Sequence, residues 1–114
     1  MTIKRGEMKQ EDRENMRGGE GAVHFTHYIP EKSHKNLRLA AEVALPPGAT
    51  IGYHQHVNET EYFIFLEGSG TVNDDGTEIF VQKGDILITG EGASHGVANT
   101  GQVPLVFTAF IVTY

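Results

Sequence analysis

Apolar and polar side chains alternate along one clear stretch of the chain. In Leu37–Leu45 every odd-numbered position is apolar, whereas the even-numbered positions include Arg38 and Glu42. A period of two places one set of side chains on each face of a β-strand, so this stretch predicts a strand with one buried face. The segment Glu61–Glu67 is aromatic and apolar through its middle, which is typical of a strand packed between two layers.

Turn residues interrupt the apolar segments at short intervals. Asn73-Asp74-Asp75-Gly76 lies between two such segments and predicts a β-hairpin. Further turns rich in glycine or proline are Pro46-Pro47-Gly48, Lys83-Gly84-Asp85, Gly90-Glu91-Gly92 and Thr100-Gly101-Gln102. About nine or ten strands result, with no helix longer than a turn or two. This arrangement predicts an all-β antiparallel sandwich or barrel, such as a jelly roll.

The chain has the length of a single domain, with an N-terminal segment of different character. Residues 1–21 carry mixed charges with Met8 and Met16 as apolar anchors, and the run Gly18-Gly19-Glu20-Gly21 breaks any regular structure. We therefore expect 1–21 to form an N-terminal arm with one helical turn and a hinge. Residues 22–114 are expected to form one barrel domain.

Composition and charge exclude several classes of function. The sequence has no cysteine, which excludes disulfide frameworks, thiolate zinc sites, iron–sulfur clusters and cysteine nucleophiles. Nine Lys and Arg against fifteen Asp and Glu give a net charge of −6, which argues against nucleic-acid partners and anionic membrane surfaces. No apolar run approaches the ~20 residues of a membrane span, and the N-terminus lacks the apolar stretch of a signal peptide. We therefore expect a cytoplasmic protein.

Two histidines and one glutamate are spaced as metal ligands could be. His54 and His56 are two residues apart, so on a strand both imidazoles point to the same face. Glu61 follows five residues later and joins them only if residues 57–60 turn the chain, for which Asn58 is well suited. Such a set suits Fe, Mn, Zn, Ni or Co rather than Ca or Mg. The alternative is that the histidines are surface residues on an edge strand.

Glycines frame these ligands at set spacings, and a second block of the same kind follows. The blocks are Gly48-x5-His54-x1-His56-x4-Glu61-x6-Gly68 and Gly84-x5-Gly90-x1-Gly92-x2-His95-x3-Asn99. Together they resemble the two sequence motifs of the cupin superfamily. Gly90 departs from the motif, because a proline is usual there; the change concerns the stiffness of a turn and not the ligands. The run Asn15–Gly21 and the compact layout further resemble short bacterial and archaeal cupins of the oxalate-decarboxylase-like kind.

The resemblance implies a single jelly-roll barrel with a metal site on its inner face. It implies that His54, His56, Glu61 and His95 hold one divalent metal per chain, with Mn or Fe expected first and Zn or Ni as alternatives. Four protein ligands leave coordination positions open, as in a catalytic site. We expect an oxidoreductase of the dioxygenase type, or a lyase, decarboxylase or isomerase, acting on a small molecule with a carboxylate or carbonyl group. The alternative is a non-catalytic cupin that binds or senses a small ligand.

Strand parity predicts further pocket residues. If Glu61 faces inward, so do Phe63 and Phe65; the last strand then presents either 107, 109 and 111 or 106, 108, 110 and 112. Arg38 and Glu42 share a strand face, so they are candidates for a catalytic pair that binds a carboxylate and moves a proton. The plainer alternative for this pair is an exposed salt bridge.

The remaining polar residues are assigned to the surface or to an interface. Tyr53 and Gln55 point away from the ligands by parity, and Arg17 could close over a pocket or lie in an interface. Three histidines outside the motifs are expected at the surface or an interface: His24, His27 and His34. Because the edge of a small barrel needs protection, we expect a homodimer in which the N-terminal arm is exchanged.

Overall fold

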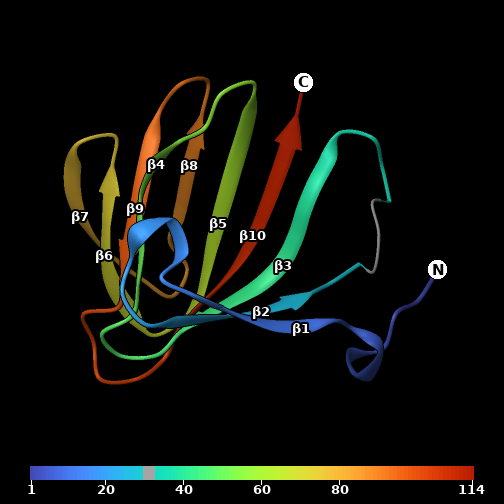
Figure 1. Cartoon of the computed structure of the whole chain (residues 1–114), viewed down its shortest axis with the longest axis horizontal. Helices are drawn as coiled ribbons and strands as arrows, with labels where there is room; N and C mark the ends of the chain where they lie inside the picture. The colour runs from blue at the N-terminus through green and yellow to red at the C-terminus, as the bar shows by residue number, and fades with distance from the viewer. Residues whose placement is uncertain (30–32) are drawn as a thin grey trace.

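The computed structural model describes residues 1–29 and 33–114 and has the expected all-β architecture (Figure 1). Two 3-10 turns occur in these residues, η1 (Arg5–Glu7) and η2 (Met16–Gly18). The strands of the described residues are β1 (Gln10–Glu14), β2 (Ala22–His27), β3 (Leu37–Leu45), β4 (Thr50–Gln55), β5 (Glu59–Glu67), β6 (Ser69–Asp74), β7 (Thr77–Gln82), β8 (Ile86–Gly90), β9 (Ser94–Ala98) and β10 (Leu105–Thr113). Within this part of the chain no helix is long and apolar enough to cross a membrane.

The strands form two antiparallel sheets. The six-stranded sheet has the order β1-β2-β3-β10-β5-β8, and the four-stranded sheet has the order β4-β9-β6-β7. From β3 onward the chain passes repeatedly from one sheet to the other, so strands distant in sequence become neighbours; β10, for example, lies between β3 and β5 (Figure 1). This topology confirms the predicted jelly roll.

The hydrophobic core lies between the two sheets. Phe25, Phe65 and Phe107 are fully buried there, together with Leu45 and Val72. Phe63 and Phe65 face inward from β5, as strand parity predicted. On β10, the inward face is the one that carries residues 107, 109 and 111, because all three are buried in the interior and line its cavity.

The hairpin between β6 and β7 forms where the turn signal predicted it. Its register pairs Asp74 with Thr77, so Asp75 and Gly76 are the two residues of the turn. Both have positive φ, 49° and 101° respectively, which is the conformation of a type I′ turn. The Asp–Gly pair fits because both residue types accept left-handed backbone at low cost.

The N-terminal segment contains a strand that the sequence did not predict. Strand β1 pairs antiparallel with β2 and forms one edge of the six-stranded sheet. Its sequence, Gln-Glu-Asp-Arg-Glu, is polar because it packs no apolar side chain into the core. Polar cross-strand pairs accompany its backbone ladder: His24 bonds Asp12 and Gln10, and His27 bonds Glu11 at 2.8 Å.

Candidate metal centre

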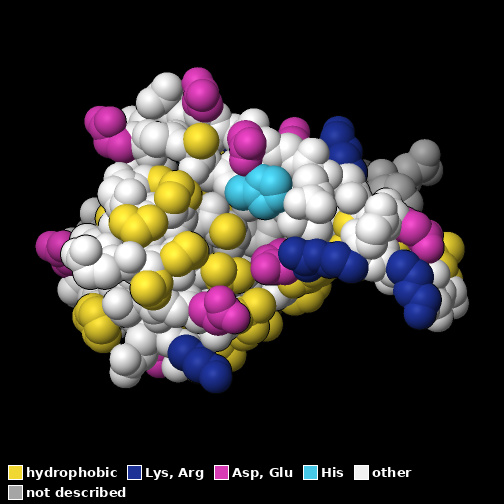
Figure 2. All heavy atoms as spheres, turned by 90° about the horizontal axis from the view of Figure 1, so that it is seen from below, with side chains coloured by type: hydrophobic (Ala, Val, Ile, Leu, Met, Phe, Trp, Pro, Cys, Tyr) yellow, Lys and Arg dark blue, Asp and Glu magenta, His cyan; other side chains and the backbone are white. Residues whose placement is uncertain are grey.

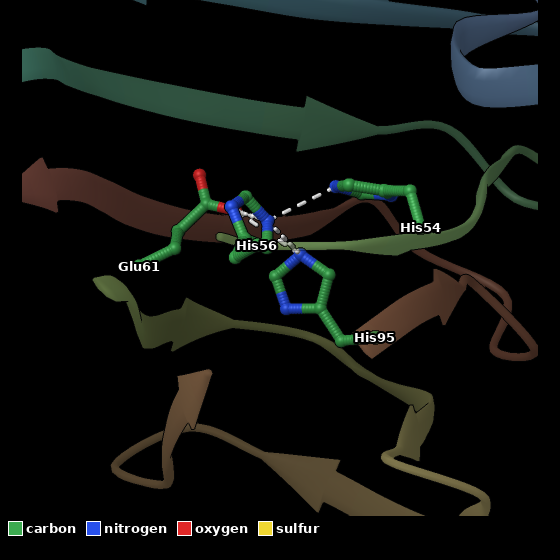
Figure 3. A group of neighbouring side chains, drawn as sticks. All are labelled: His54, His56, Glu61 and His95. Atoms are coloured by element: carbon green, nitrogen blue, oxygen red, sulfur yellow. Dashed lines mark hydrogen bonds and ion pairs between the residues drawn. The ribbon is translucent and has the colours of Figure 1, made fainter. Parts of the chain in front are cut away.

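The four predicted ligands come from three strands in two sheets and meet at one point (Figure 3). His54 on β4 is directly opposite His95 on β9 in the strand register. His56 follows the end of β4, and Glu61 lies on β5 in the other sheet. One possible ligand atom of each residue can be chosen so that all four lie within 4.8 Å of one another. The structure therefore brings together the set that the sequence predicted.

A left-handed residue lets Glu61 join the histidines. Asn58 has φ 59°, in the bend between β4 and β5. There the chain leaves the four-stranded sheet and enters the six-stranded one. On one continuous strand His56 and Glu61, five residues apart, would point to opposite faces, but the change of sheet lets both point to the cluster. The chain therefore bends at Asn58, inside the predicted stretch 57–60, and Glu59 and Thr60 already belong to β5.

The ligand atoms are close together and shielded from solvent. Nε2 of His56 lies 3.2 Å from Nε2 of His54 and 3.1 Å from Nε2 of His95. Oε1 of Glu61 lies 3.1 Å from Nε2 of both His56 and His95. The exposed fractions of His56, Glu61 and His95 are 2%, 6% and 0%, whereas His54 is half-buried. Solvent therefore reaches the cluster mainly from the side of His54.

The outer nitrogen, Nδ1, of each histidine forms a hydrogen bond with a different residue. His54 Nδ1 donates to the carbonyl oxygen of Gly52 at 2.7 Å, and His56 Nδ1 donates to Glu59 at 2.5 Å. His95 Nδ1 lies 2.8 Å from the hydroxyl oxygen of Thr89 on β8. A carbonyl or carboxylate oxygen can only accept, so in the neutral rings of His54 and His56 the proton is on Nδ1 and Nε2 carries a bare lone pair.

These lone pairs make the cluster suitable for a cation. The bare Nε2 atoms of His54 and His56 lie 3.2 Å apart, and the Glu61 oxygen lies 3.1 Å from that of His56, so these atoms repel one another unless a positive charge lies between them. His54, His56, Glu61 and His95 would hold a divalent transition metal, because imidazole and carboxylate donors suit such ions. When bound, that metal supplies Lewis-acid chemistry and, for a redox-active ion, chemistry with O₂.

Burial and the neighbouring charges move the pKa values of the cluster. Burial raises the pKa of Glu61, but the imidazoles of His56 and His95, which donate to the carboxylate when they are protonated, outweigh it, and the net shift is downward. The carboxylate of Glu61, which accepts a hydrogen bond from the protonated ring, raises the pKa of His56 against the effect of its burial. Burial lowers the pKa of His54, and the Gly52 carbonyl opposes this only in part. Glu61 is therefore the anionic member of the cluster near neutral pH.

Glu59 is a functional residue that sequence reasoning missed. Its carboxylate accepts the Nδ1 proton of His56 and also two hydrogen bonds of 2.9 Å from Arg38. Burial raises the pKa of Glu59, but the hydrogen bonds from Arg38 and from His56 lower it by more. The net shift is downward, so the carboxylate stays ionised. The available signal was a carboxylate between two ligands of the first motif, three residues after His56.

The predicted pair of Arg38 and Glu42 does not form. Arg38 binds Glu59 instead, and Glu42 accepts a 2.6 Å bond from Arg5 near the N-terminus. The ladder between β3 and β10 skips Arg38, because Ile111 pairs with Leu39 and Val112 with Leu37. This bulge interrupts the alternation of the strand at Arg38, which lines the cavity with its side chain still exposed, whereas Glu42 does not line the cavity.

A cavity of about 500 Å³ lies between the sheets, and the cluster forms part of its wall. His54, His56 and Glu61 line it, whereas His95 lies behind them. The rest of the wall is mostly apolar and aromatic, from residues such as Phe25, Leu39, Phe63, Phe107 and Ile111. Three arginines also line the cavity: Arg13, Arg17 and Arg38.

Most of the other polar residues that were predicted at the surface lie there. Tyr53 and Gln55 are exposed and point away from the cluster, as expected. His24 lies beside Asp12 near the surface, and exposed His34 accepts a hydrogen bond from the backbone N–H of Asn36. His27 differs from expectation, because it is half-buried and lines the cavity.

The fold and the cluster together define a jelly-roll protein with a potential metal site of three histidines and one glutamate. The chain belongs to the cupin family: the family described as Cupin domain matches residues 41–112. It is 37% identical to the oxalate-binding protein of Thermotoga maritima over 113 residues, which cover 98% of this chain and 93% of that protein.

Solved structures agree with this assignment. A predicted oxalate decarboxylase from Thermotoga maritima superposes with a TM-score of 0.94 at 36% identity, and the match covers 100% of both chains. The cupin domain of Schizosaccharomyces pombe Cnp3 superposes with a TM-score of 0.75 at 17% identity, covering 91% of this chain and 69% of that one. The second likeness concerns the fold alone. The predicted resemblance to small oxalate-decarboxylase-like cupins is confirmed.

Proposed function

We propose that this cupin is a metal-dependent enzyme that acts on a small organic molecule with a carboxylate or carbonyl group. The observation that carries the proposal is that three ligands, His54, His56 and Glu61, face a cavity of about 500 Å³. A structural metal site is usually closed by its four protein ligands, whereas a catalytic one keeps a position open toward substrate. A ligand in this cavity can approach the cluster directly.

The donor set supports a divalent transition metal, with Mn or Fe expected first. Imidazole nitrogens suit Zn, Cu, Fe and Ni, and a carboxylate oxygen extends the set to Mn. Ions of this class that take more than four ligands would keep a position for substrate or water beside His54, His56, Glu61 and His95. Zn and Ni stay as alternatives.

The residues around the ligands fix the rings and exclude water. Glu59 and Thr89 hold the Nδ1 atoms of His56 and His95, which sets the direction of each Nε2 lone pair. The ring of Phe63 stacks on His95 with centroids 4.8 Å apart, and the apolar wall continues through Phe107. An apolar wall strengthens every polar contact that a substrate makes inside.

A second candidate function is binding without turnover. The relative from Thermotoga maritima, 37% identical, is named an oxalate-binding protein, and the same cluster could hold a carboxylate without converting it. The two functions differ in one measurable respect. An enzyme consumes its ligand in proportion to time and protein, whereas a binding protein retains it at one equivalent or less per site.

The first experiment measures metal content by plasma mass spectrometry. We expect about one equivalent of Mn or Fe in the wild-type protein and its loss in His54→Ala and His95→Ala. His24→Ala, which removes a histidine outside the cluster, is the matched control and should keep the metal. O₂ uptake and CO₂ release on a panel of small carboxylates then separate turnover from binding. A protein that takes up no metal after reconstitution would overturn the proposal.

A homodimer and a cytoplasmic location stay predictions. Strand β1 is held on one side only, by β2, so an exchanged arm could occupy the same edge. Light scattering of a chain lacking residues 1–20 tests this, because an exchanged arm predicts monomers. A persistent dimer would place the interface elsewhere, for example at Ile86 and Ile88, each 59% exposed on β8. Figure 2 shows apolar side chains gathered on the broad part of one face.

A further inference from the structure

We propose that the cavity takes an amphipathic organic acid, with its carboxylate bound by Arg17 and its apolar part against the aromatic wall. This inference rests on the proposed function, because it names the class of ligand for the same cavity. It makes Arg17 a residue that determines specificity. It also distinguishes the ligand from oxalate, which has two carboxylates and no apolar part.

The charges around the cavity single out Arg17. Arg13 is already engaged, with bonds of 2.8 and 3.2 Å to Glu11 and its guanidinium 4.2 Å above the ring of Phe25. Arg38 is engaged by Glu59 through two bonds of 2.9 Å. Within residues 1–29 and 33–114, Arg17 has no acidic partner within ion-pair distance. Arg17, an exposed residue that lines the cavity, thus keeps the donors of its guanidinium for a ligand.

An unpaired cation here is notable because the chain as a whole is acidic. The net charge of −6 opposes the approach of an anion, so binding requires a local positive charge. A guanidinium beside a carboxylate forms two parallel charge-assisted hydrogen bonds, which is stronger than a neutral pair.

The backbone around Arg17 is held in an unusual conformation. Asn15 and Arg17 both have positive φ, 50° and 55°, which residues with a side chain rarely adopt. The Asn15 side-chain amide donates to the carbonyl oxygen of Gly19 at 3.1 Å. The backbone N–H of Gly18 donates to the backbone carbonyl oxygen of Asn15. Strained residues of this kind persist where the surrounding structure fixes them, and they cluster at ligand sites.

Strand β4 is shaped to receive this turn. A Cβ on Gly52 would lie 1.9 Å from the carbonyl oxygen of Arg17, so only glycine permits the turn to lie so close to the strand. Gly19 likewise packs against the backbone of Thr50, and Thr50 Oγ1 accepts the N–H of Glu20 at 2.8 Å. Gly52 is two residues before His54, so the same stretch of β4 positions both the arginine and a cluster ligand.

The remaining wall of the cavity describes the rest of the ligand. Six apolar side chains that line it are Phe25, Leu37, Leu39, Phe63, Phe107 and Ile111. A volume of about 500 Å³ is within the range of cavities that hold drug-sized molecules. Oxalate would leave this wall without contact, whereas an acid with an apolar body buries it. Each buried CH₂ contributes favourably through the hydrophobic effect.

The test is a binding series measured by isothermal titration calorimetry on metal-reconstituted protein. The probes are oxalate, acetate, hexanoate, phenylacetate and the neutral hexanamide. We expect hexanoate and phenylacetate to bind more tightly than acetate and oxalate, and hexanamide to bind more weakly than hexanoate. Arg17→Gln should lower the affinity for hexanoate by about tenfold or more. Arg5→Gln removes an arginine outside the cavity wall and should leave hexanoate binding unchanged.

Two further measurements keep the outcome clear. Arg17→Asn provides a second variant, because asparagine accepts a positive φ if glutamine disturbs the turn. The metal content of both variants should equal that of the wild type, so a failure of the metal site is detected separately from a failure of acid binding. Oxalate binding as tight as hexanoate binding, or unchanged hexanoate affinity in both variants, would overturn the inference.

Discussion

Glu59 accepts a 2.5 Å hydrogen bond from Nδ1 of His56 and thereby fixes which nitrogen of that ring faces the cluster. Because Arg38 binds the same carboxylate through both of its oxygens, Glu59 is itself held in place. A chain of contacts thus runs from a bulge in β3 to a ligand beyond the end of β4. Carboxylates placed in this way behind a metal-binding histidine set the tautomer and raise the basicity of the ring.

Removing the charge of Glu59 should weaken metal binding while leaving the fold intact. We expect Glu59→Gln to lower the affinity for Mn²⁺ by about 10- to 100-fold, since the amide holds the His56 ring less firmly. Competition with a chelator of known affinity measures the change. Glu67→Gln, an exposed position on the same strand, is the matched control and should bind as the wild type does. Equal affinities of all three proteins would show that Glu59 does not support the site.

Metal affinity should fall as the pH is lowered. Every histidine ligand must be without a proton on Nε2, and an unperturbed histidine takes up a second proton below about pH 6.5. Burial lowers the pKa of His54, which favours its ligand form, whereas the carboxylate of Glu61 stabilises the protonated ring and raises the pKa of His56. His56 is therefore the histidine for which protons compete most strongly. In titrations with Mn²⁺ from pH 8 to pH 5, the affinity should fall more and more steeply. A constant affinity over this range would contradict the assignment of histidine ligands.

Much of the fold and the ligand set could be predicted from the sequence, because local signals carried them. The alternation in β3 and the Asp75-Gly76 turn need only neighbouring residues to be recognised. Strand β1 was missed because an edge strand of polar residues lacks the apolar period that marks a strand. The partner of Arg38 was missed for a different reason: a bulge interrupts the alternation of β3 at Arg38, and only the pairing of β3 with β10 reveals it.

The glycine at position 90, where the cupin motif usually has a proline, is explained by a contact with another strand. Gly90 pairs with Thr60 on β5, and a Cβ at Gly90 would lie 2.2 Å from the Thr60 hydroxyl oxygen. The close approach of β5 and β8 therefore requires a small residue at this position. No signal within the second motif could have indicated this contact, since Thr60 belongs to the first.

Gly52→Ala should destabilise the protein and displace the turn that carries Arg17. The added methyl group would overlap the Arg17 carbonyl oxygen, so either the turn or β4 must move. We expect a loss of about 1–3 kcal/mol in the free energy of unfolding, measured by urea denaturation. Gly6→Ala is the control, because no atom lies within 4 Å of its added Cβ. A Gly52→Ala protein as stable as the wild type would show that the turn is not tightly packed on the strand.

The contact between Glu11 and its neighbours should make stability depend on pH in the acid range. The hydrogen bond from His27, followed by that from Arg13, lowers the pKa of Glu11 from 4.5 to about 2. Above pH 4.5 the carboxylate is ionised in both the folded and the unfolded chain, and its stabilising effect is complete. As the pH falls from there toward about 2, the unfolded chain takes up the proton first, so this contribution is lost.

A comparison of Glu11→Gln with the wild type isolates that contribution. We expect the variant to have a lower urea midpoint at pH 6, and we expect the difference to shrink steadily as the pH approaches 2. Glu14→Gln, at an exposed position of the same strand, should show little difference at any pH. Because β1 pairs with β2 alone, the loss should appear first as increased hydrogen exchange of the β1 amides. A difference in midpoint that stays constant from pH 6 to pH 2 would mean that the charge of Glu11 does not stabilise this edge of the sheet.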